Sequence, residues 1–263
     1  MKGNTENEQK LYGESWNRAF GGYFSDPDVA APMVKAVVEA AELSGPAVIV
    51  DLGGGTGFLL AEIADSLGPD GRSRLVCVDE ADAQLEDCPE GIETLDSRVE
   101  TVWRSQLARE GETLMLCMRS VLHYFGEDGL RPELAKIRSL LIPGEYFVHQ
   151  TICMENEADR AISNLLYMRM DTGKWYPMVN ELLEAVESQG FLVESVVPAP
   201  PFDLTQVQLE ERYGIARDRM EEIRDELESV SPAPRALLRG ENTFTIRLDY
   251  QIMTCVAQEK KGL

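Results

Sequence analysis

The sequence predicts an α/β domain with a mostly parallel, seven-stranded sheet, helices on both faces and an antiparallel last strand. From Ala47 onward, short apolar runs alternate with segments of helical periodicity. Most of these runs are continuously apolar, which is typical of parallel strands buried on both faces. The last run, residues 244–257, is longer and alternates between apolar and polar positions, so we expect it to pair antiparallel.

The expected domain organisation follows from where this rhythm starts and where it is interrupted. Residues 1–44 precede it and are predicted to form an N-terminal helical cap segment, and residues 45–263 form the main domain. Two stretches inside that domain do not fit the alternation, at about 154–176 and 201–242. We expect them to be insertions on the rim of the sheet, where lids and substrate pockets are built.

The first expected helices lie before the sheet. Trp16 and Phe20 fall close to one helical face. A second helix is expected to start at Ser25 or Asp26 as the cap residue, with Pro27 in its first turn.

The expected strands are the apolar runs that follow. They are residues 47–52, 74–79, 99–103, 113–118, 145–152, 191–197 and 244–257. Helical periodicity is clearest at 57–67 and 130–141, between consecutive strands. This order of strands and helices predicts βαβ units and therefore a parallel sheet.

Composition narrows the functional classes. The chain has 263 residues and a formal net charge of −21, the opposite of what phosphate contacts require, so no nucleic-acid partner is expected. The polar N-terminus has no apolar signal region, and no apolar run approaches the length of a membrane span. The five cysteines lack metal-site spacing, so we expect reduced thiols, no metal and a cytoplasmic protein acting on a small molecule.

The stretch "VIVDLGGGTGFLL", residues 48–60, is compatible with two unrelated sites. One is the phosphate-binding hairpin of the actin and heat-shock ATPases, and the other is a glycine turn between a strand and a helix. After the glycines, apolar residues recur at helical spacing: Leu59, Leu60, Ile63, Ala64 and Leu67. A helix therefore follows, which argues against the ATPase hairpin.

The spacing of the glycines distinguishes a dinucleotide-binding motif from another type of ligand-binding turn. A dinucleotide motif counted from Gly53 would need a glycine where Phe58 stands, which weakens the alternative of an NAD(P)-dependent oxidoreductase. Gly53, Gly55 and Gly57 instead give Gly-x-Gly-x-Gly after Asp51. Such a turn lets a backbone approach a ligand, while the carboxylate can receive an ammonium group. A turn that only packs the helix against the strand remains the structural alternative.

With this motif the chain resembles the class I S-adenosylmethionine-dependent methyltransferases, over about residues 45–200 and the last strand. The resemblance implies a Rossmann-like fold, methyl transfer and S-adenosylmethionine as cofactor. It implies cofactor contacts at Asp51, Gly53, Gly54, Gly55, Asp79, Glu80, Arg104, Ser105 and Arg119. In the family an acidic residue after the second strand holds the ribose hydroxyls, and "RLVCVDE" supplies Asp79 there. The register of the third strand stays open, because Asp96 lies before the preferred run at 99–103.

The segment "MRSVLHYFGED" after the fourth strand resembles that of small-molecule O-methyltransferases. It places His123 where those enzymes have a general base, so the resemblance implies oxygen as the preferred acceptor atom over nitrogen or carbon. A packing role for His123 is the alternative. The other histidine, His149, lies inside a strand and is expected in the core or behind the site.

An apolar acceptor pocket is predicted from aromatic and methionine residues outside the regular elements: Trp16, Phe20, Tyr167, Met170 and Trp175. These residues fit an ordinary lid core equally well. A non-catalytic protein that binds S-adenosylmethionine to regulate a partner stays possible, because catalysis by alignment needs few side chains. Neither the identity of the acceptor nor the oligomeric state follows from the sequence.

Overall fold

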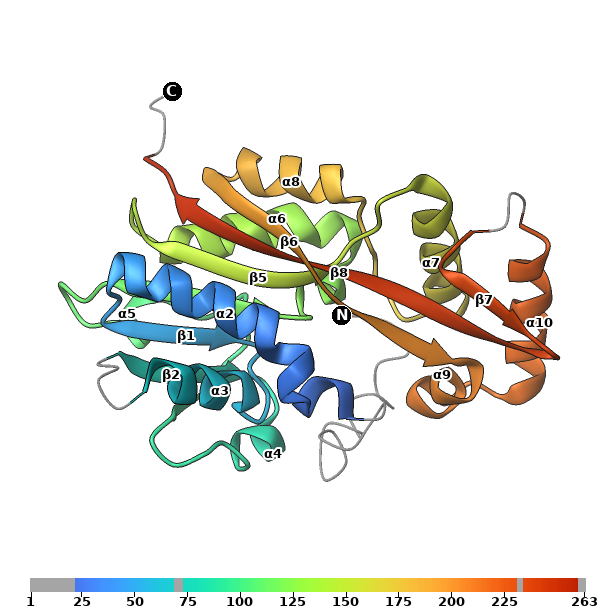
Figure 1. The fold of residues 1–263 in the computed structure, drawn as a ribbon, viewed down its shortest axis with the longest axis horizontal. Helices are drawn as coiled ribbons and strands as arrows, with labels where there is room; N and C mark the ends of the chain where they lie inside the picture. The colour runs from blue at the N-terminus through green and yellow to red at the C-terminus, as the bar shows by residue number, and fades with distance from the viewer. Residues whose placement is uncertain (1–21, 69–72, 231–233, 260–263) are drawn as a thin grey trace.

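The computed structural model describes residues 22–68, 73–230 and 234–259. Within them, eight strands form one mixed sheet in the order β3-β2-β1-β4-β5-β8-β6, with β7 also pairing β8 (Figure 1). The strands are β1 (Val48–Leu52), β2 (Arg74–Asp79), β3 (Glu93–Asp96), β4 (Leu114–Arg119), β5 (Tyr146–Ile152), β6 (Phe191–Thr205), β7 (Leu237–Gly240) and β8 (Thr243–Ala257). Strands β1 to β5 pair in parallel, and β8 pairs antiparallel with β5, β6 and β7. The predicted fold class is confirmed, with β7 as an additional strand.

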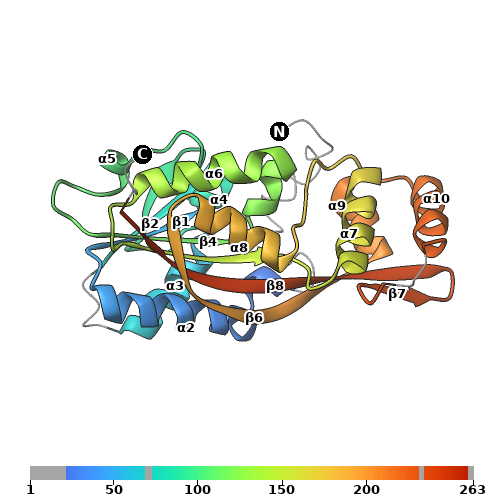
Figure 2. The same cartoon turned by 90° about the horizontal axis from the view of Figure 1, so that it is seen from above.

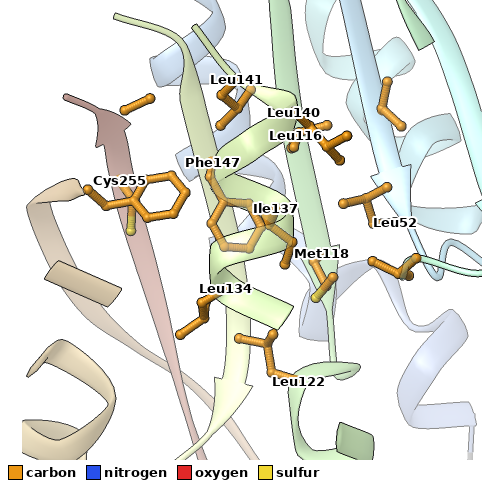
Figure 3. Close-up of a cluster of buried hydrophobic side chains, with 14 of the residues drawn as sticks. Leu52, Leu116, Met118, Leu122, Leu134, Ile137, Leu140, Leu141, Phe147 and Cys255 are labelled. Atoms are coloured by element: carbon orange, nitrogen blue, oxygen red, sulfur yellow. The ribbon is translucent and has the colours of Figure 1, made fainter. Parts of the chain in front are cut away.

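Helices cover both faces of this sheet (Figure 2). They are α2 (Pro27–Ser44), α3 (Phe58–Leu67), α4 (Asp82–Leu85), α5 (Arg104–Leu107), α6 (Gly126–Leu140), α7 (Glu157–Arg169), α8 (Val179–Ser188), α9 (Gln206–Tyr213) and α10 (Arg217–Glu228), with a 3-10 turn η2 (Leu122–Phe125). Helices α6 and α8 lie on one face, and α2 and α3 on the other. Apolar side chains of α6 pack onto the central strands, as Leu134 and Ile137 do beside Leu116 and Phe147 (Figure 3).

Helix α2 starts at the expected residues, after the cap Asp26, but it packs against the sheet and does not form a cap over the site. The carboxylate of Asp26 caps it, accepting a hydrogen bond of 2.9 Å from the backbone N–H of Asp28. Its buried side chains, among them Met33 and Val37, pack with Ile49 of the sheet and with α3. The helix therefore belongs to the layer that covers the sheet, so the expected cap of residues 1–44 is wrong for this part.

The third strand corrects the sequence prediction. Residues 99–103 were expected to form it, but the strand is Glu93–Asp96, paired with β2 alone at the edge of the sheet. An edge strand can be short and polar, so "ETLD" carries no apolar run. The apolar side chains of Val99 and Val102 are also buried, but they belong to the loop after this strand.

The two long strands β6 and β8 extend past the rest of the sheet and carry a second lobe (Figure 1). Helices α7, α9 and α10 pack there with β7 around an apolar cluster separate from the main core. The predicted insertions at 154–176 and 201–242 supply most of this lobe, although β6 itself continues to Thr205. No helix in the described part of the chain is long and apolar enough to cross a membrane.

Candidate active site

A cleft of about 460 Å³ lies at the carboxyl ends of the parallel strands, where open α/β sheets bind ligands. It is lined from β1, β2 and β4 and from the segments that follow β1 to β4. Seven of the predicted cofactor residues are among its lining residues: Asp51, Gly53, Gly54, Gly55, Asp79, Glu80 and Arg119. The sheet therefore brings together residues from three separate strands.

The glycine turn after β1 is packed too closely for side chains. Gly53 has a left-handed backbone (φ +74°), and a Cβ there would lie 2.6 Å from Val121. A Cβ on Gly54 would lie 2.7 Å from the sulfur of Cys77 and 2.9 Å from Asp51 Oδ2. Both backbone N–H groups donate to the carbonyl of Val78, at 2.7 and 3.1 Å, so the turn is tied to β2.

Asp51 is a buried carboxyl group facing this turn. Only 2% of it is exposed, and its Oδ1 accepts no hydrogen bond from any residue that the structure describes. Burial raises the pKa of Asp51 to about 7, because an ionised carboxylate is poorly solvated there, and the nearby Arg119 opposes the rise. A buried carboxylate with an open oxygen suits a cationic ligand group.

Arg119 ends β4 and lines the same cleft. Its guanidinium donates to the backbone carbonyls of Phe24 and Tyr23, at 3.1 and 3.4 Å. Besides its predicted contact with the cofactor, these bonds give Arg119 a structural role in joining the segment before α2 to the sheet. Burial lowers the pKa of Arg119.

Asp79, at the position predicted to bind the ribose, is hydrogen-bonded to the glycine turn. Its Oδ2 accepts a hydrogen bond of 2.9 Å from the N–H of Gly55, and its Oδ1 accepts one of 2.9 Å from that of Ala81. Burial raises the pKa of Asp79, and these backbone hydrogen bonds oppose the rise because they stabilise the carboxylate. A side chain at the end of β2 thus holds the loop after β1 in place.

The sequence did not identify several lining residues. Residues 97–100 line the cleft, and they follow the edge strand that was misplaced in the prediction. Ser120, directly after β4, has a left-handed backbone (φ +64°) and bonds through its hydroxyl to that of Tyr250 in β8. A non-glycine residue in this conformation is the kind of local strain that occurs at functional sites.

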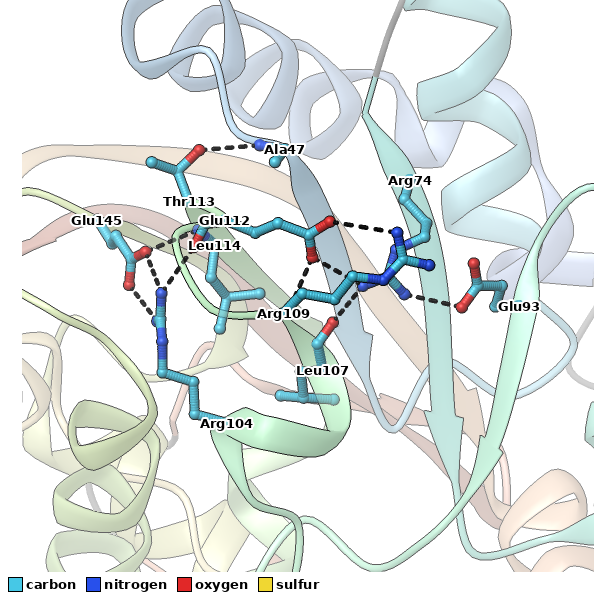
Figure 4. Close-up of polar contacts among 10 residues, drawn as sticks. All are labelled: Ala47, Arg74, Glu93, Arg104, Leu107, Arg109, Glu112, Thr113, Leu114 and Glu145. Carbon is cyan, nitrogen blue, oxygen red and sulfur yellow. Dashed lines mark hydrogen bonds and ion pairs between the residues drawn. The ribbon is translucent and has the colours of Figure 1, made fainter.

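Arg104 and Ser105 do not lie where the resemblance implied. Both belong to α5, and neither lines the cleft among the described residues. Arg104 donates to both carboxylate oxygens of Glu145, at 2.6 and 2.8 Å, at the start of β5 (Figure 4). This pair lies where the parallel strands begin, which we call the amino edge of the sheet, and the cleft lies at the opposite, carboxyl edge. The predicted cofactor contacts at these two residues are therefore wrong. The error follows from placing the third strand at 99–103.

His123 lies in η2 with its ring buried. Five per cent of it is exposed, and its imidazole stacks on Tyr124 at 4.5 Å and packs against Tyr176 at 5.5 Å between ring centroids. It is not among the described residues that line the cleft. This placement matches the packing alternative. His149 is fully buried in β5, as expected, and burial lowers its pKa to about 3.

The predicted acceptor residues do not form one pocket. Tyr167 and Met170 are each 1% exposed and belong to the core of the second lobe. Trp175 is partly buried against the main core. Trp16 and Phe20 lie outside the described residues. The lid-core alternative therefore holds for Tyr167 and Met170.

The residues in the cleft fit the cofactor that the sequence suggested. A carboxylate oxygen of Asp51 without a described partner suits an ammonium group, and Gly53, Gly54 and Gly55 line the cleft without side chains. The carboxylate of Asp79 suits a pair of hydroxyl groups. Among the described residues, no group of three or more His, Cys, Asp or Glu side chains is arranged to hold a metal ion.

Solved structures define the class to which this fold belongs. No protein-family model matches the sequence, and no curated protein matches it either. An S-adenosylmethionine-dependent methyltransferase from Geobacter sulfurreducens, bound to S-adenosylhomocysteine, superposes with a TM-score of 0.57 at 12% identity, over 95% of this chain and 98% of that one.

Two further neighbours have known acceptors. The 1,6-didemethyltoxoflavin-N1-methyltransferase of Burkholderia thailandensis gives a TM-score of 0.53 at 15% identity, over 90% and 81% of the two chains. The mitomycin 7-O-methyltransferase MmcR gives 0.56 at 16% identity, over 95% of this chain and 60% of that one. The chain therefore has the fold of the class I S-adenosylmethionine-dependent methyltransferases.

Proposed function

We propose that this protein is an S-adenosylmethionine-dependent methyltransferase that acts on a small molecule, and that oxygen is its preferred acceptor atom. The observation that carries the proposal is the buried, open oxygen of Asp51 facing a glycine turn that Asp79 holds in place. When bound, S-adenosylmethionine supplies a methyl group on a positively charged sulfur.

In this proposal the chain's own residues bind and orient the cofactor. Asp51 receives the ammonium group of the cofactor, and Asp79 receives its ribose hydroxyls. The N-terminus of α3, whose cap residue Gly57 has no side chain to accept from the first N–H groups, favours the negative charge of a carboxylate. Because the ring of His123 is buried, we assign rate enhancement to alignment of the reactants rather than to this imidazole.

The acceptor atom rests on weaker support than the cofactor. The neighbours that share the fold include an O-methyltransferase and an N-methyltransferase, and a fold by itself does not fix an acceptor. Oxygen is preferred here because the segment "MRSVLHYFGED" as a whole resembles the corresponding segment of O-methyltransferases, and not because His123 removes a proton. All five cysteines are free thiols, which suits the proposed cytoplasmic location.

Calorimetry of the purified protein tests the cofactor, with S-adenosylhomocysteine and NADH as ligands. We expect S-adenosylhomocysteine to bind and NADH not to bind. Asp51→Asn should weaken binding markedly, whereas Asp203→Asn, a change at an exposed carboxylate in β6, should not. Tight binding of NADH alone would falsify the proposal in favour of an oxidoreductase.

A second assay tests methyl transfer itself. The protein is incubated with methyl-labelled S-adenosylmethionine and a pool of metabolites, and label in small-molecule products is measured. Cofactor binding without any transferred label would favour the non-catalytic, regulatory alternative.

A further inference from the structure

A second hollow, of about 530 Å³, lies beside the cleft. The two cavities share Glu100, Tyr124 and Phe125 as lining residues. Its remaining walls come from one side of α6 and from the segment after α7: Gly129, Pro132, Glu133, Lys136, Thr172 and Gly173. The hollow therefore adjoins the cleft, and Thr172 and Gly173 of the predicted 154–176 insertion form part of its wall.

Glu133 is the unusual member of this lining. It is only 4% exposed, and its Oε1 has no hydrogen-bond partner in the part of the chain that the structure describes. Buried carboxylates are normally paired, because an unpaired charge away from water is costly. Burial raises the pKa of Glu133 to about 7, with a further rise from Glu100 and an opposing effect from Lys136. One oxygen of Glu133 therefore lies buried beside the hollow without a hydrogen-bond partner among the described residues.

Two carboxyl groups, of Glu100 and Glu133, line the hollow, against Lys136 as the one cationic side chain among the described lining residues. Two further cations lie at the junction with the cleft, where Nζ of Lys174 is 4.2 Å from the ring centroid of Tyr124 and Arg212 donates to the Tyr124 hydroxyl at 3.4 Å. A cationic group of a ligand is therefore favoured beside the carboxyl groups and not at this junction. The ammonium of Lys136 lies 4.1 Å from the ring centroid of Trp103, so this charge is held against an aromatic face. Phe125 adds aromatic surface at the junction with the cleft, which suits an apolar or aromatic body, whereas the ring of Tyr124 already stacks on His123 and contacts Lys174.

We propose that this hollow binds the methyl acceptor, and that the acceptor carries a basic amine that pairs with the carboxylate of Glu133. The inference rests on the proposed function, and it adds a recognition group: besides the hydroxyl that is methylated, the acceptor carries a basic amine on an apolar or aromatic body. Glu133 binds and positions the molecule through its ammonium group. Its role is recognition, and no proton transfer or covalent step is assigned to it.

The test uses the full-length protein saturated with S-adenosylhomocysteine and a matched pair of probes. Tyramine carries a phenol hydroxyl and an ammonium group, and 4-(2-hydroxyethyl)phenol has a similar shape and the same phenol without the charge. We expect tyramine to bind about tenfold more tightly or better, measured by ligand-observed NMR titration, because a buried carboxylate pairs with its ammonium group. Glu133→Gln should abolish this preference. Asp128→Asn, at an exposed carboxylate of the same helix, should retain it.

The outcomes separate this inference from the proposed function. S-adenosylhomocysteine should bind the wild type and Glu133→Gln equally. If it binds neither, the proposed function fails. If it binds both but the wild type shows no preference for the amine, or Glu133→Gln keeps that preference, the assignment of the hollow is wrong. Glu133→Met, which keeps the volume and removes both oxygens, gives the same readout should the glutamine variant fold poorly.

Discussion

The amino and carboxyl edges of the parallel sheet differ in whether their buried polar groups have hydrogen-bond partners. At the amino edge, the Glu145 carboxylate accepts two hydrogen bonds from Arg104 and one each from the N–H groups of Leu114 and Ile142, all between 2.6 and 2.8 Å (Figure 4). Arg104 also donates to the carbonyls that end α6 and precede β4. Both charged groups of this pair therefore have several hydrogen-bond partners among the described residues.

The carboxyl edge leaves comparable groups open. Asp51 is as buried as Glu145 and has an oxygen without a partner among the described residues. Gly53 and Ser120 have left-handed backbones there. A satisfied network contributes to stability, whereas an unsatisfied group stores free energy that a ligand can recover on binding. The comparison assigns stability to the amino edge and binding to the carboxyl edge.

The largest effect is expected from breaking the satisfied network. Glu145→Ala leaves Arg104 without its carboxylate and should reduce the free energy of unfolding by about 3–5 kcal/mol, the usual cost of removing one partner of a buried pair. Urea denaturation measures it. Affinity for S-adenosylhomocysteine should stay unchanged at temperatures where the variant is folded. Weakened binding with normal stability would reverse the assignment of the two edges.

The carboxyl edge should respond in the opposite way. Asp79→Ala removes the expected ribose contact and the bond to Gly55, so S-adenosylhomocysteine should bind about 1–3 kcal/mol more weakly. Titration calorimetry gives the dissociation constant, and thermal melting serves as the control. An unchanged dissociation constant would show that the ribose lies elsewhere.

The pH dependence of Asp51 sharpens the comparison further. Its pKa is raised from 3.8 to about 7, so the folded protein holds the proton more tightly than the unfolded chain. Relative to Asp51→Asn, the stability contributed by this group is complete below pH 3.8 and is lost as the pH rises through about 7. An ammonium ligand needs the ionised form, so affinity should rise toward pH 7 by up to about 1.4 kcal/mol per pH unit and then level off. Affinity that is flat between pH 5 and about 8 would remove Asp51 from the site.

The smallest effect is expected at an exposed pair on the long strands. Arg247 donates to both oxygens of Asp203 across β6 and β8, at 2.8 and 2.7 Å, with more than 40% of each side chain exposed. Arg247→Ala should cost only about 0.2–1 kcal/mol in unfolding free energy, because water screens the pair. A cost near that of Glu145→Ala would mean that burial is not what distinguishes the amino edge.

Local patterns in the sequence were sufficient for the central part of the site. An apolar strand, a glycine turn and an amphipathic helix follow one another within twenty residues, so their order predicts Asp51 and the glycines at the carboxyl edge. Asp79 came from the resemblance to the methyltransferase family, applied to the end of the next strand. In both cases neighbours along the chain decide the local structure, and parallel pairing then places the strand ends together.

Tertiary structure decided everything that depends on contacts between distant segments. An edge strand is half solvated, so nothing in "ETLD" distinguished it from a loop, and the positions of Arg104 and Ser105 changed with it. Arg104 meets Glu145 across 41 residues, and the burial of His123 depends on Tyr176 from another segment. In the sequence Glu133 does not differ from the other charged positions of α6. In the structure it is buried, and it lines a hollow together with Thr172 from a distant segment. A sequence pattern records periodicity within one element. Which side chains lose water, and which of those find a partner, is determined only when the elements pack together.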